Sequence, residues 1–333
     1  MTNFLILSND SPEHYFFKPY EGICVKKQSP SGSWQEHRPV LTDGGDIFCV
    51  YADSKGLVHL ICTDSDNRLI YAIRKNDVWK KYTLSTLSKD IFISDIRIYP
   101  IKGRLNFLYS ALYCGETLLV HCILGDHARP STIATLETSH FYIKNSRIYF
   151  TNSQGTLGYS SLSDEAPSVF YPLAEDAHFC TVSDLCGKEI MIFTRNSRLF
   201  INGEEILYDC RMEMPVFVRG ADRSYVMWKS GSFIRYITTF NGGATWSGPM
   251  CFMSTGISPS VFIAQQGEEY NMFYGYQSGS EITLLGAPDI FEKSSASYCE
   301  IDELKKQLSR SKAETESAKM EIKRLNKIIS GMM

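Results

Sequence analysis

The chain has 333 residues, of which 44% are hydrophobic and 21% are charged, and its formal net charge at pH 7 is only -3. This length and apolar content allow a substantial buried core. The near-balance of charges gives no reason to expect nucleic acid or an anionic membrane surface as a partner. No stretch approaches the roughly twenty apolar residues of a membrane-spanning helix, so we expect no membrane span.

The first residues and the cysteines bear on where the protein works. The sequence starts Met-Thr-Asn-Phe-Leu-Ile-Leu, which has no basic leader and too short an apolar run for a secretory signal. Ten cysteines occur at irregular intervals, and this favours free thiols in a reducing compartment over a disulfide framework. We therefore expect a cytoplasmic protein.

A short strand recurs along the chain at a spacing of roughly 35 to 47 residues. Each copy is apolar or rich in β-branched and aromatic residues, as strands are. The copies lie at 14–18, 58–62, 105–109, 147–151, 189–193, 224–228 and 269–274. This spacing is typical of the four-stranded blade of a β-propeller.

Further strands and turns can be fitted around each copy, and they predict the fold. Most units accommodate four strands joined by short polar turns, but the last shows only three before Pro288. A strand at 3–7 could supply the fourth, which would close the ring and cover both open sheet edges. The prediction is an all-β propeller over residues 1–288, with seven blades and with six as the alternative.

One segment, 239–246, reads Thr-Phe-Asn-Gly-Gly-Ala-Thr-Trp between two of the expected strands. Its asparagine can bond to its own turn, its second glycine permits a positive φ, and its tryptophan can fill the space between sheets. The motif residues are Thr239, Asn241, Gly243, Thr245 and Trp246. The segment resembles the Asp-box hairpin of sialidase-type propellers, where it has a structural role.

The resemblance raises the question of sialidase chemistry. Such an enzyme needs three arginines to hold a substrate carboxylate, a tyrosine nucleophile activated by a glutamate, and an aspartic acid. The family's first arginine lies early in the chain, whereas the first arginine here is Arg38, and the nearest echo of its strand is at 96–100. Tyr274 or Tyr276 could stand for the nucleophile. We expect no catalytic residues and no enzyme.

Other chemical motifs are missing as well. The sequence has no phosphate-binding glycine loop, nucleophile elbow, paired Cys-x-x-Cys or His-Glu-x-x-His. The segment 64–67, Asp-Ser-Asp-Asn, faintly resembles a calcium loop, but a polar hairpin turn is the better interpretation. His59 and His121 lie within expected strands, where we interpret them as structural residues. We predict no metal and no cofactor.

From residue 300 the apolar period changes to that of a heptad repeat. The residues predicted to form an oligomerisation seam are Ile301, Leu304, Leu308, Ile322, Leu325 and Ile329. Glutamates recur at the g positions and lysines at the e positions, a pattern that favours parallel helices. A linker at 289–299 and a parallel coiled coil at 300–333 are therefore predicted, as a homodimer with a trimer possible. The alternative is one amphipathic helix lying on the propeller.

These elements predict a non-catalytic binding or scaffold protein, with a propeller head multiplied by the coiled coil so that weak contacts gain avidity. Its partner would be a protein or a glycan. Two alternatives stay open. One is a carbohydrate-binding or diverged sialidase-like protein, and the other is a structural component of a fibre or coat. A fold alone does not choose among them.

Overall fold

The structure is a computed structural model. It describes residues 3–8, 11–29, 33–125, 130–162, 169–220, 223–231, 233–252, 259–278 and 281–285. The chain divides into two compact units, Met1–Gly286 and Ala287–Met333. The second unit lies outside the described residues, and with it lie the predicted linker and the heptad seam from Ile301 to Ile329.

The described residues form β-strands, turns and loops, so the prediction of an all-β fold is confirmed for them. The described residues of the first unit form 26 strands in successive antiparallel groups. The first group comprises β1 (Phe4–Ser8), β2 (Ser11–Phe17), β3 (Ile23–Lys27) and β4 (Arg38–Leu41). The second comprises β5 (Gly44–Ala52), β6 (Val58–Asp64), β7 (Arg68–Lys75) and β8 (Val78–Thr86).

The third and fourth groups share one long strand. The third comprises β9 (Phe92–Ile101), β10 (Arg104–Tyr113), β11 (Glu116–Ile123) and the first half of β12 (Ser131–Lys144). The fourth comprises the second half of β12 with β13 (Arg147–Asn152), β14 (Thr156–Ser161) and β15 (Tyr171–Glu175). Because β12 pairs with β11 through one half and with β13 through the other, the two groups form one seven-stranded sheet.

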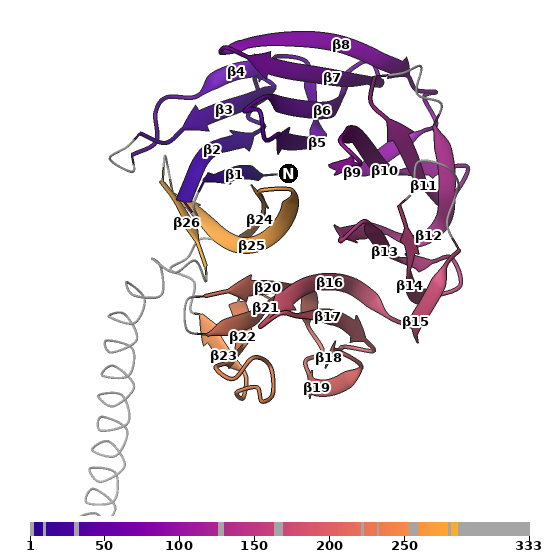
Figure 1. Ribbon diagram of the computed structural model, residues 1–333, viewed down its shortest axis with the longest axis vertical. Helices are drawn as coiled ribbons and strands as arrows, with labels where there is room; N and C mark the ends of the chain where they lie inside the picture. Colours follow the sequence, from indigo (N-terminus) through magenta and orange to yellow (C-terminus); the bar gives the residue numbers. More distant parts are fainter. Residues whose placement is uncertain are drawn as a thin grey trace, which may run out of the picture. The chain divides into compact units, whose positions relative to one another are not determined.

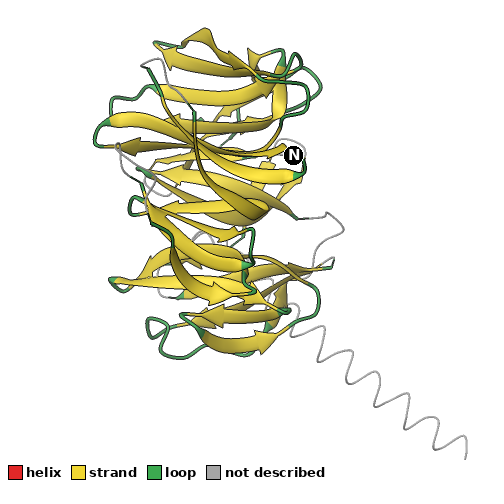
Figure 2. Ribbon diagram, turned by 90° about the vertical axis from the view of Figure 1, so that its right-hand side faces the viewer, coloured by secondary structure: helices red, strands yellow, loops and turns green. Residues whose placement is uncertain are grey.

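Three groups complete the unit. The fifth comprises β16 (His178–Leu185), β17 (Lys188–Arg195), β18 (Arg198–Ile201) and β19 (Glu204–Tyr208). The sixth comprises β20 (Met212–Arg219), β21 (Ser224–Ser230), β22 (Phe233–Thr239) and β23 (Met250–Phe252). The last comprises β24 (Ser260–Gln266), β25 (Glu269–Ser278) and β26 (Glu281–Leu284). Figure 1 shows the groups following one another around a common centre, and Figure 2 shows the loops at the two ends of the strands.

The recurring strand found in the sequence is the second strand of each group, namely β2, β6, β10, β13, β17, β21 and β25. These strands are apolar because neighbouring groups cover both of their faces. In β21, for example, every residue is buried except Lys229. The outer strand β8 is exposed along almost its whole length, which is why its sequence carries no comparable apolar signal.

The two ends of the described chain meet, as the sequence suggested, through the N-terminal strand. The N-terminal strand β1 pairs in parallel with β24, the first strand of the last group, and antiparallel with β2. The strand expected at 3–7 therefore does add a fourth strand to the last group, next to its inner strand β24, and it also belongs to the first group through β2. Phe4 and Leu5 face opposite sides of β1 and both are fully buried. A strand that is apolar on both faces belongs in the interior, whereas an outer strand would expose one of them.

The pairing of β1 with β24 joins the first and last groups in a second seven-stranded sheet. The largest apolar cluster follows this join, since it contains Phe4, Ile263 and Tyr270 together with residues of the first three groups. The strand arrangement is that of a β-propeller. Because two of the five sheets each contain two groups, the blade number of seven stays a prediction.

Several turns share one device, in which an Asp or Asn oxygen accepts hydrogen bonds from the amides two and four residues later. It occurs at Asp53 with Lys55 and Leu57, at Asp64 with Asp66 and Arg68, and at Asn152 with Gln154 and Thr156. Oδ2 of Asp64 also accepts a hydrogen bond from Nε of Arg68 over 2.8 Å. The segment 64–67 is thus the polar hairpin turn expected from the sequence.

The two histidines interpreted as structural have polar neighbours. Nδ1 of His59 lies 2.8 Å from the hydroxyl of Tyr71, and Nε2 of His121 lies 2.9 Å from Oδ1 of Asn106. No helix among the described residues is long and apolar enough to cross a membrane.

Candidate functional site

A cavity among the described residues lies at the centre of the first unit, between the inner strands of several groups. About 730 Å³ of space lies between its atoms, part of it open to solvent. Polar groups gather on one part of its lining, which includes Asp95 and Arg97 from β9 and Thr138 and His140 from β12. Concave sites with a few convergent polar groups among apolar walls are the usual places where proteins bind small ligands.

Asp95 and Arg97 form an ion pair on the cavity wall. They lie two residues apart on β9, so both side chains point to the same face of the strand. Nη1 of Arg97 donates to Oδ1 of Asp95 and, over 2.7 Å, to the carbonyl of Ile96. Only 15% of the Asp95 side chain and 13% of the Arg97 side chain is exposed. Burial raises the pKa of Asp95, and the guanidinium beside it works in the opposite direction.

His140 is the third ionisable group of the cavity. It lies where β12 passes from the third strand group to the fourth, and part of its surface is exposed to the cavity space. Enclosure by protein atoms lowers its pKa, Asp95 raises it, and Arg97 lowers it again. The net effect lowers the pKa of His140 below its usual value of 6.5, which favours the neutral imidazole at pH 7.

Two contacts connect the fourth and last strand groups beside this cavity. The hydroxyl of Tyr142 donates to the carbonyl of Tyr270 over 3.1 Å. The ammonium of Lys144 lies 2.5 Å from Glu269 and 2.9 Å from Asp184. Lys144 is itself buried, and although burial acts to lower its pKa, these two carboxylates raise it above the usual value. The cavity walls are therefore tied together by groups from three strand groups.

Tyr270 belongs to the cavity lining, and its hydroxyl makes two hydrogen bonds to residues of β5. Its hydroxyl donates to the carbonyl of Val50 over 3.1 Å, and the thiol of Cys49 donates to the same hydroxyl over 3.3 Å. Burial raises the pKa of Tyr270 well above its usual range. This tyrosine is a rigid, neutral part of the wall.

The residues of the predicted Asp-box lie elsewhere, in the hairpin between β22 and β23. Oδ1 of Asn241 accepts from the amide of Thr245 over 3.0 Å, and Nδ2 of Asn241 donates to the hydroxyl of Thr245 over 2.8 Å. The hydroxyl of Thr239 accepts from the amide of Gly243, whose φ is +87°. The hairpin is thus closed by its own side chains.

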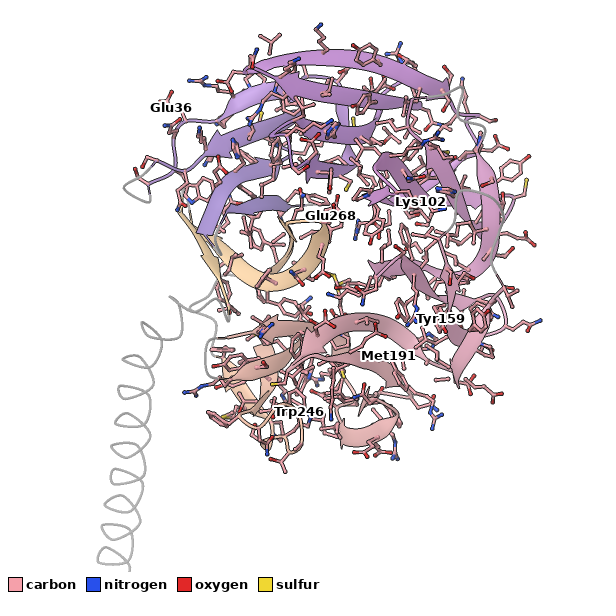
Figure 3. All side chains as sticks on the ribbon, viewed as in Figure 1. Glu36, Lys102, Tyr159, Met191, Trp246 and Glu268 are labelled. Atoms are coloured by element: carbon pink, nitrogen blue, oxygen red, sulfur yellow. The ribbon has the colours of Figure 1, made fainter. Side chains whose placement is uncertain are left out.

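Trp246 follows this turn and is half-buried against the apolar cluster that contains Leu185 and Trp228. Figure 3 shows it in an outer hairpin, while Glu268 lies near the centre. None of the five motif residues lines the cavity. Their contacts fit a structural role, and the name Asp-box rests on the resemblance.

The residues weighed for sialidase chemistry do not converge. The hydroxyl of Tyr274 contacts the carbonyls of Glu213 and Met214, and neither Tyr274 nor Tyr276 lines the cavity. The segment 96–100 does reach it, because Arg97 is there. Among the described lining residues, Arg97 is the only arginine. A clamp of three arginines is therefore not assembled by the described residues of this cavity.

Sequence reasoning missed Asp95, Thr138 and His140 as site residues. One signal was available, because Asp95 and Arg97 interrupt an apolar inner strand with two charges on one face. Thr138 and His140 gave no such signal, since their place depends on the path of β12 between two strand groups. Among the described residues, no three His, Cys, Asp or Glu side chains cluster as metal ligands would.

No protein-family model matches the chain, and no curated protein does either. Among solved structures, the BP39L lectin of Burkholderia pseudomallei is similar with a TM-score of 0.54 and 10% identity, over 85% of this chain and 95% of that one. The fungal lectin of Aleuria aurantia, described as six-bladed, has a TM-score of 0.45 and 9% identity, over 85% and 89%. The sialidase of Trypanosoma rangeli has 0.43 and 12%, over 85% and 61%. The likeness to BP39L supports the β-propeller fold, and at this identity it extends to the fold alone.

Proposed function

We propose that this protein is a non-catalytic binding protein that holds a small ligand in its central cavity. The observation that carries the proposal is the state of Arg97. Among the described residues, its hydrogen bonds all run from Nη1, which leaves Nε and Nη2 without a protein partner. Both charged side chains of the Asp95 and Arg97 pair keep some surface open to the cavity. Nearly buried donors with unused capacity are what a specific ligand can satisfy.

The non-catalytic part of the proposal rests on the absence of an assembled reaction centre in this cavity as described. Its single arginine is already paired with Asp95. Tyr270, a possible nucleophile by residue type, uses its hydroxyl in contacts with Val50 and Cys49. An activated nucleophile would instead need a lowered pKa or a general base within hydrogen-bonding distance.

We also propose the finer architecture that the sequence predicts. In it the seven strand groups are seven blades, and the heptads from Ile301 to Ile329 join two or three copies in parallel. Parallel helices would place equivalent cavities at one end of the assembly. Such an arrangement would raise the avidity for a ligand that is presented repeatedly on one partner, as a scaffold or recognition protein requires.

The test is a ligand screen on the full chain. Thermal shift and then isothermal titration would be measured with panels of neutral sugars, carboxylates, amines and nucleotides. Thr138→Phe fills the cavity, and Thr83→Phe on the exposed strand β8 is the matched control. At least one panel should bind the wild type and Thr83→Phe, and Thr138→Phe should lose that binding while remaining folded.

Two results would overturn the proposal. One is the absence of binding by every panel, or binding that survives in Thr138→Phe. The other is a chemical change of the bound compound, which NMR of the ligand during incubation with the protein would detect. No binding at all would leave the cavity without a ligand, binding that survives in Thr138→Phe would place the site outside the cavity, and chemical change would make the protein an enzyme.

A further inference from the structure

The cavity is electrically balanced, and this restricts what it can bind. Asp95 and Arg97 carry opposite charges at hydrogen-bonding distance, and the lowered pKa of His140 favours its neutral form at pH 7. An anion placed against Arg97 would also face the carboxylate of Asp95, and a cation would face the guanidinium. In a poorly solvated space such like-charge contacts are costly because they are only weakly screened. The balance therefore favours an uncharged ligand.

The same two side chains offer a donor and an acceptor side by side. Arg97 presents Nε and Nη2, which can only donate. The carboxylate of Asp95 can accept about four hydrogen bonds, more than Arg97 and the nearby backbone supply. A hydroxyl group both donates and accepts, so one hydroxyl, or two on neighbouring carbons, can satisfy both partners at once. A protonated amine, which only donates, or an ether, which only accepts, would satisfy only one of them.

Aromatic and apolar side chains make up most of the rest of the lining, beside Thr138, His140, Thr151 and Thr181. Phe141, Tyr142, Tyr149, Phe150 and Tyr270 contribute to it. Flat aromatic side chains bury large apolar area and are commonly paired with a few placed polar groups in ligand sites. The ligand that matches both halves of the wall has hydroxyls on one side and C–H surface on the other.

We infer that the central cavity binds an uncharged, hydroxyl-rich ring compound, that is, a neutral sugar unit, through the Asp95 and Arg97 pair. This inference rests on the proposed function, because it names the ligand class of the same cavity. It assigns no role to the hairpin of Asn241 and Trp246, whose motif residues do not line the cavity.

The experiment compares the affinities of neutral and charged sugars for the full wild-type chain, and it needs no variant. Isothermal titration would be run with D-glucose, D-galactose, D-mannose and L-fucose as neutral sugars. N-acetylneuraminic acid and D-glucosamine would serve as the anionic and cationic counterparts. At least one neutral sugar should bind, and the charged sugars should bind about tenfold more weakly or not at all.

A charge-altering variant then links the preference to the pair. Asp95→Asn keeps the side-chain shape but leaves Arg97 as an uncompensated cation in the cavity. We expect binding of the neutral sugar to weaken about tenfold or more and binding of N-acetylneuraminic acid to strengthen. Asp43→Asn is the control, since Asp43 pairs with Lys81 of the outer strand β8. Melting curves would establish that both variants are folded.

The outcomes separate the two proposals. In one outcome the protein binds a carboxylate, an amine or a nucleotide and no sugar, and loses this binding in Thr138→Phe. That result would overturn the sugar inference and leave the binding function standing. Unchanged sugar binding in a folded Asp95→Asn would also overturn the inference. Failure of every panel would overturn the proposed function itself. If Asp95→Asn does not fold, the wild-type comparison still decides the question.

Discussion

Arg74 of β7 donates a hydrogen bond from Nη2 to Nε2 of His14 on β2, over 3.1 Å, and so connects the first two strand groups. A guanidinium can only donate, so this ring nitrogen must be unprotonated. Glu13 lies 3.7 Å from the other ring nitrogen, and the charges of Lys27 and Asp77 also act on the ring. Burial, followed by Arg74, lowers the pKa of His14 from 6.5 to about 4.

The first prediction is that His14 makes the protein less stable in mild acid. The unfolded chain takes up the proton near pH 6.5, but the folded protein does so only near pH 4, so stability is lost as the pH falls between these values. The full shift corresponds to about 3 kcal/mol of unfolding free energy. Urea unfolding at pH 7.5, 5.5 and 4.5 should show a steeper loss in the wild type than in His14→Gln. The exposed His37, changed to Gln, is the control, and equal slopes in all three proteins would contradict the prediction.

The second prediction is that Trp246→Ala destabilises the fold. The indole is half-buried against Leu185 and its neighbours, so its removal should cost about 2 kcal/mol, less than for a fully buried tryptophan. Chemical unfolding of the variant would measure this. Tyr20→Ala, at a fully exposed position, should leave stability unchanged. A Trp246→Ala variant as stable as Tyr20→Ala would mean that the hairpin does not pack on the cluster.

The third prediction concerns Asp209, which is buried and accepts hydrogen bonds from Trp228 over 2.8 Å, Ser230 over 3.2 Å and Arg235 over 3.2 Å. Burial acts to raise its pKa, but these bonds outweigh it and the pKa is lowered. Asp209→Ala should cost about 3–5 kcal/mol of unfolding free energy, because it leaves buried donors and a charge without a partner.

The control for Asp209 is a surface ion pair. Glu205 binds Arg198, and both side chains are about half exposed. Glu205→Ala should change the unfolding free energy by less than about 1 kcal/mol. Similar losses for the two variants would show that the Asp209 network contributes no more than a surface pair.

The fourth prediction is oligomerisation through the heptad seam. Light scattering should give a dimer or a trimer for the full chain and a monomer for a version ending at Tyr298. The charge pattern of the seam favours parallel helices, and the apolar positions from Ile301 to Ile329 supply the burial. If the shortened protein keeps the mass of the oligomer, the contacts lie within residues 1–298.

The fifth prediction is that the protein does not hydrolyse sialosides. In the described cavity Arg97 is the only arginine, and Asp95 already pairs with it. Incubation with a fluorogenic sialoside at mildly acid pH should give no turnover above a buffer blank. Turnover that a single substitution at Arg97 or Tyr270 abolishes would contradict both this prediction and the binding function.

The sequence by itself determined the strand content of this protein. The second strand of each group carries its own signal, because both of its faces are buried and its residues must be apolar whatever its neighbours are. The hairpin of Asn241 and the turn of Asp64 could also be predicted from the sequence, because each is closed by hydrogen bonds within five residues. Local chemistry is sufficient for such features.

The sequence suggested that the strand at 3–7 joins the last group, but only the tertiary structure decided its partner strand, the parallel direction and where a ligand can bind. The pairing of β1 with β24 joins residues more than 250 positions apart, and nothing local in either strand names its partner. The cavity brings Asp95 and Arg97 from β9 together with His140 from β12 and Tyr270 from β25. Their approach depends on the closure of the ring, and a strand pattern with a period of two residues carries no information about distant neighbours.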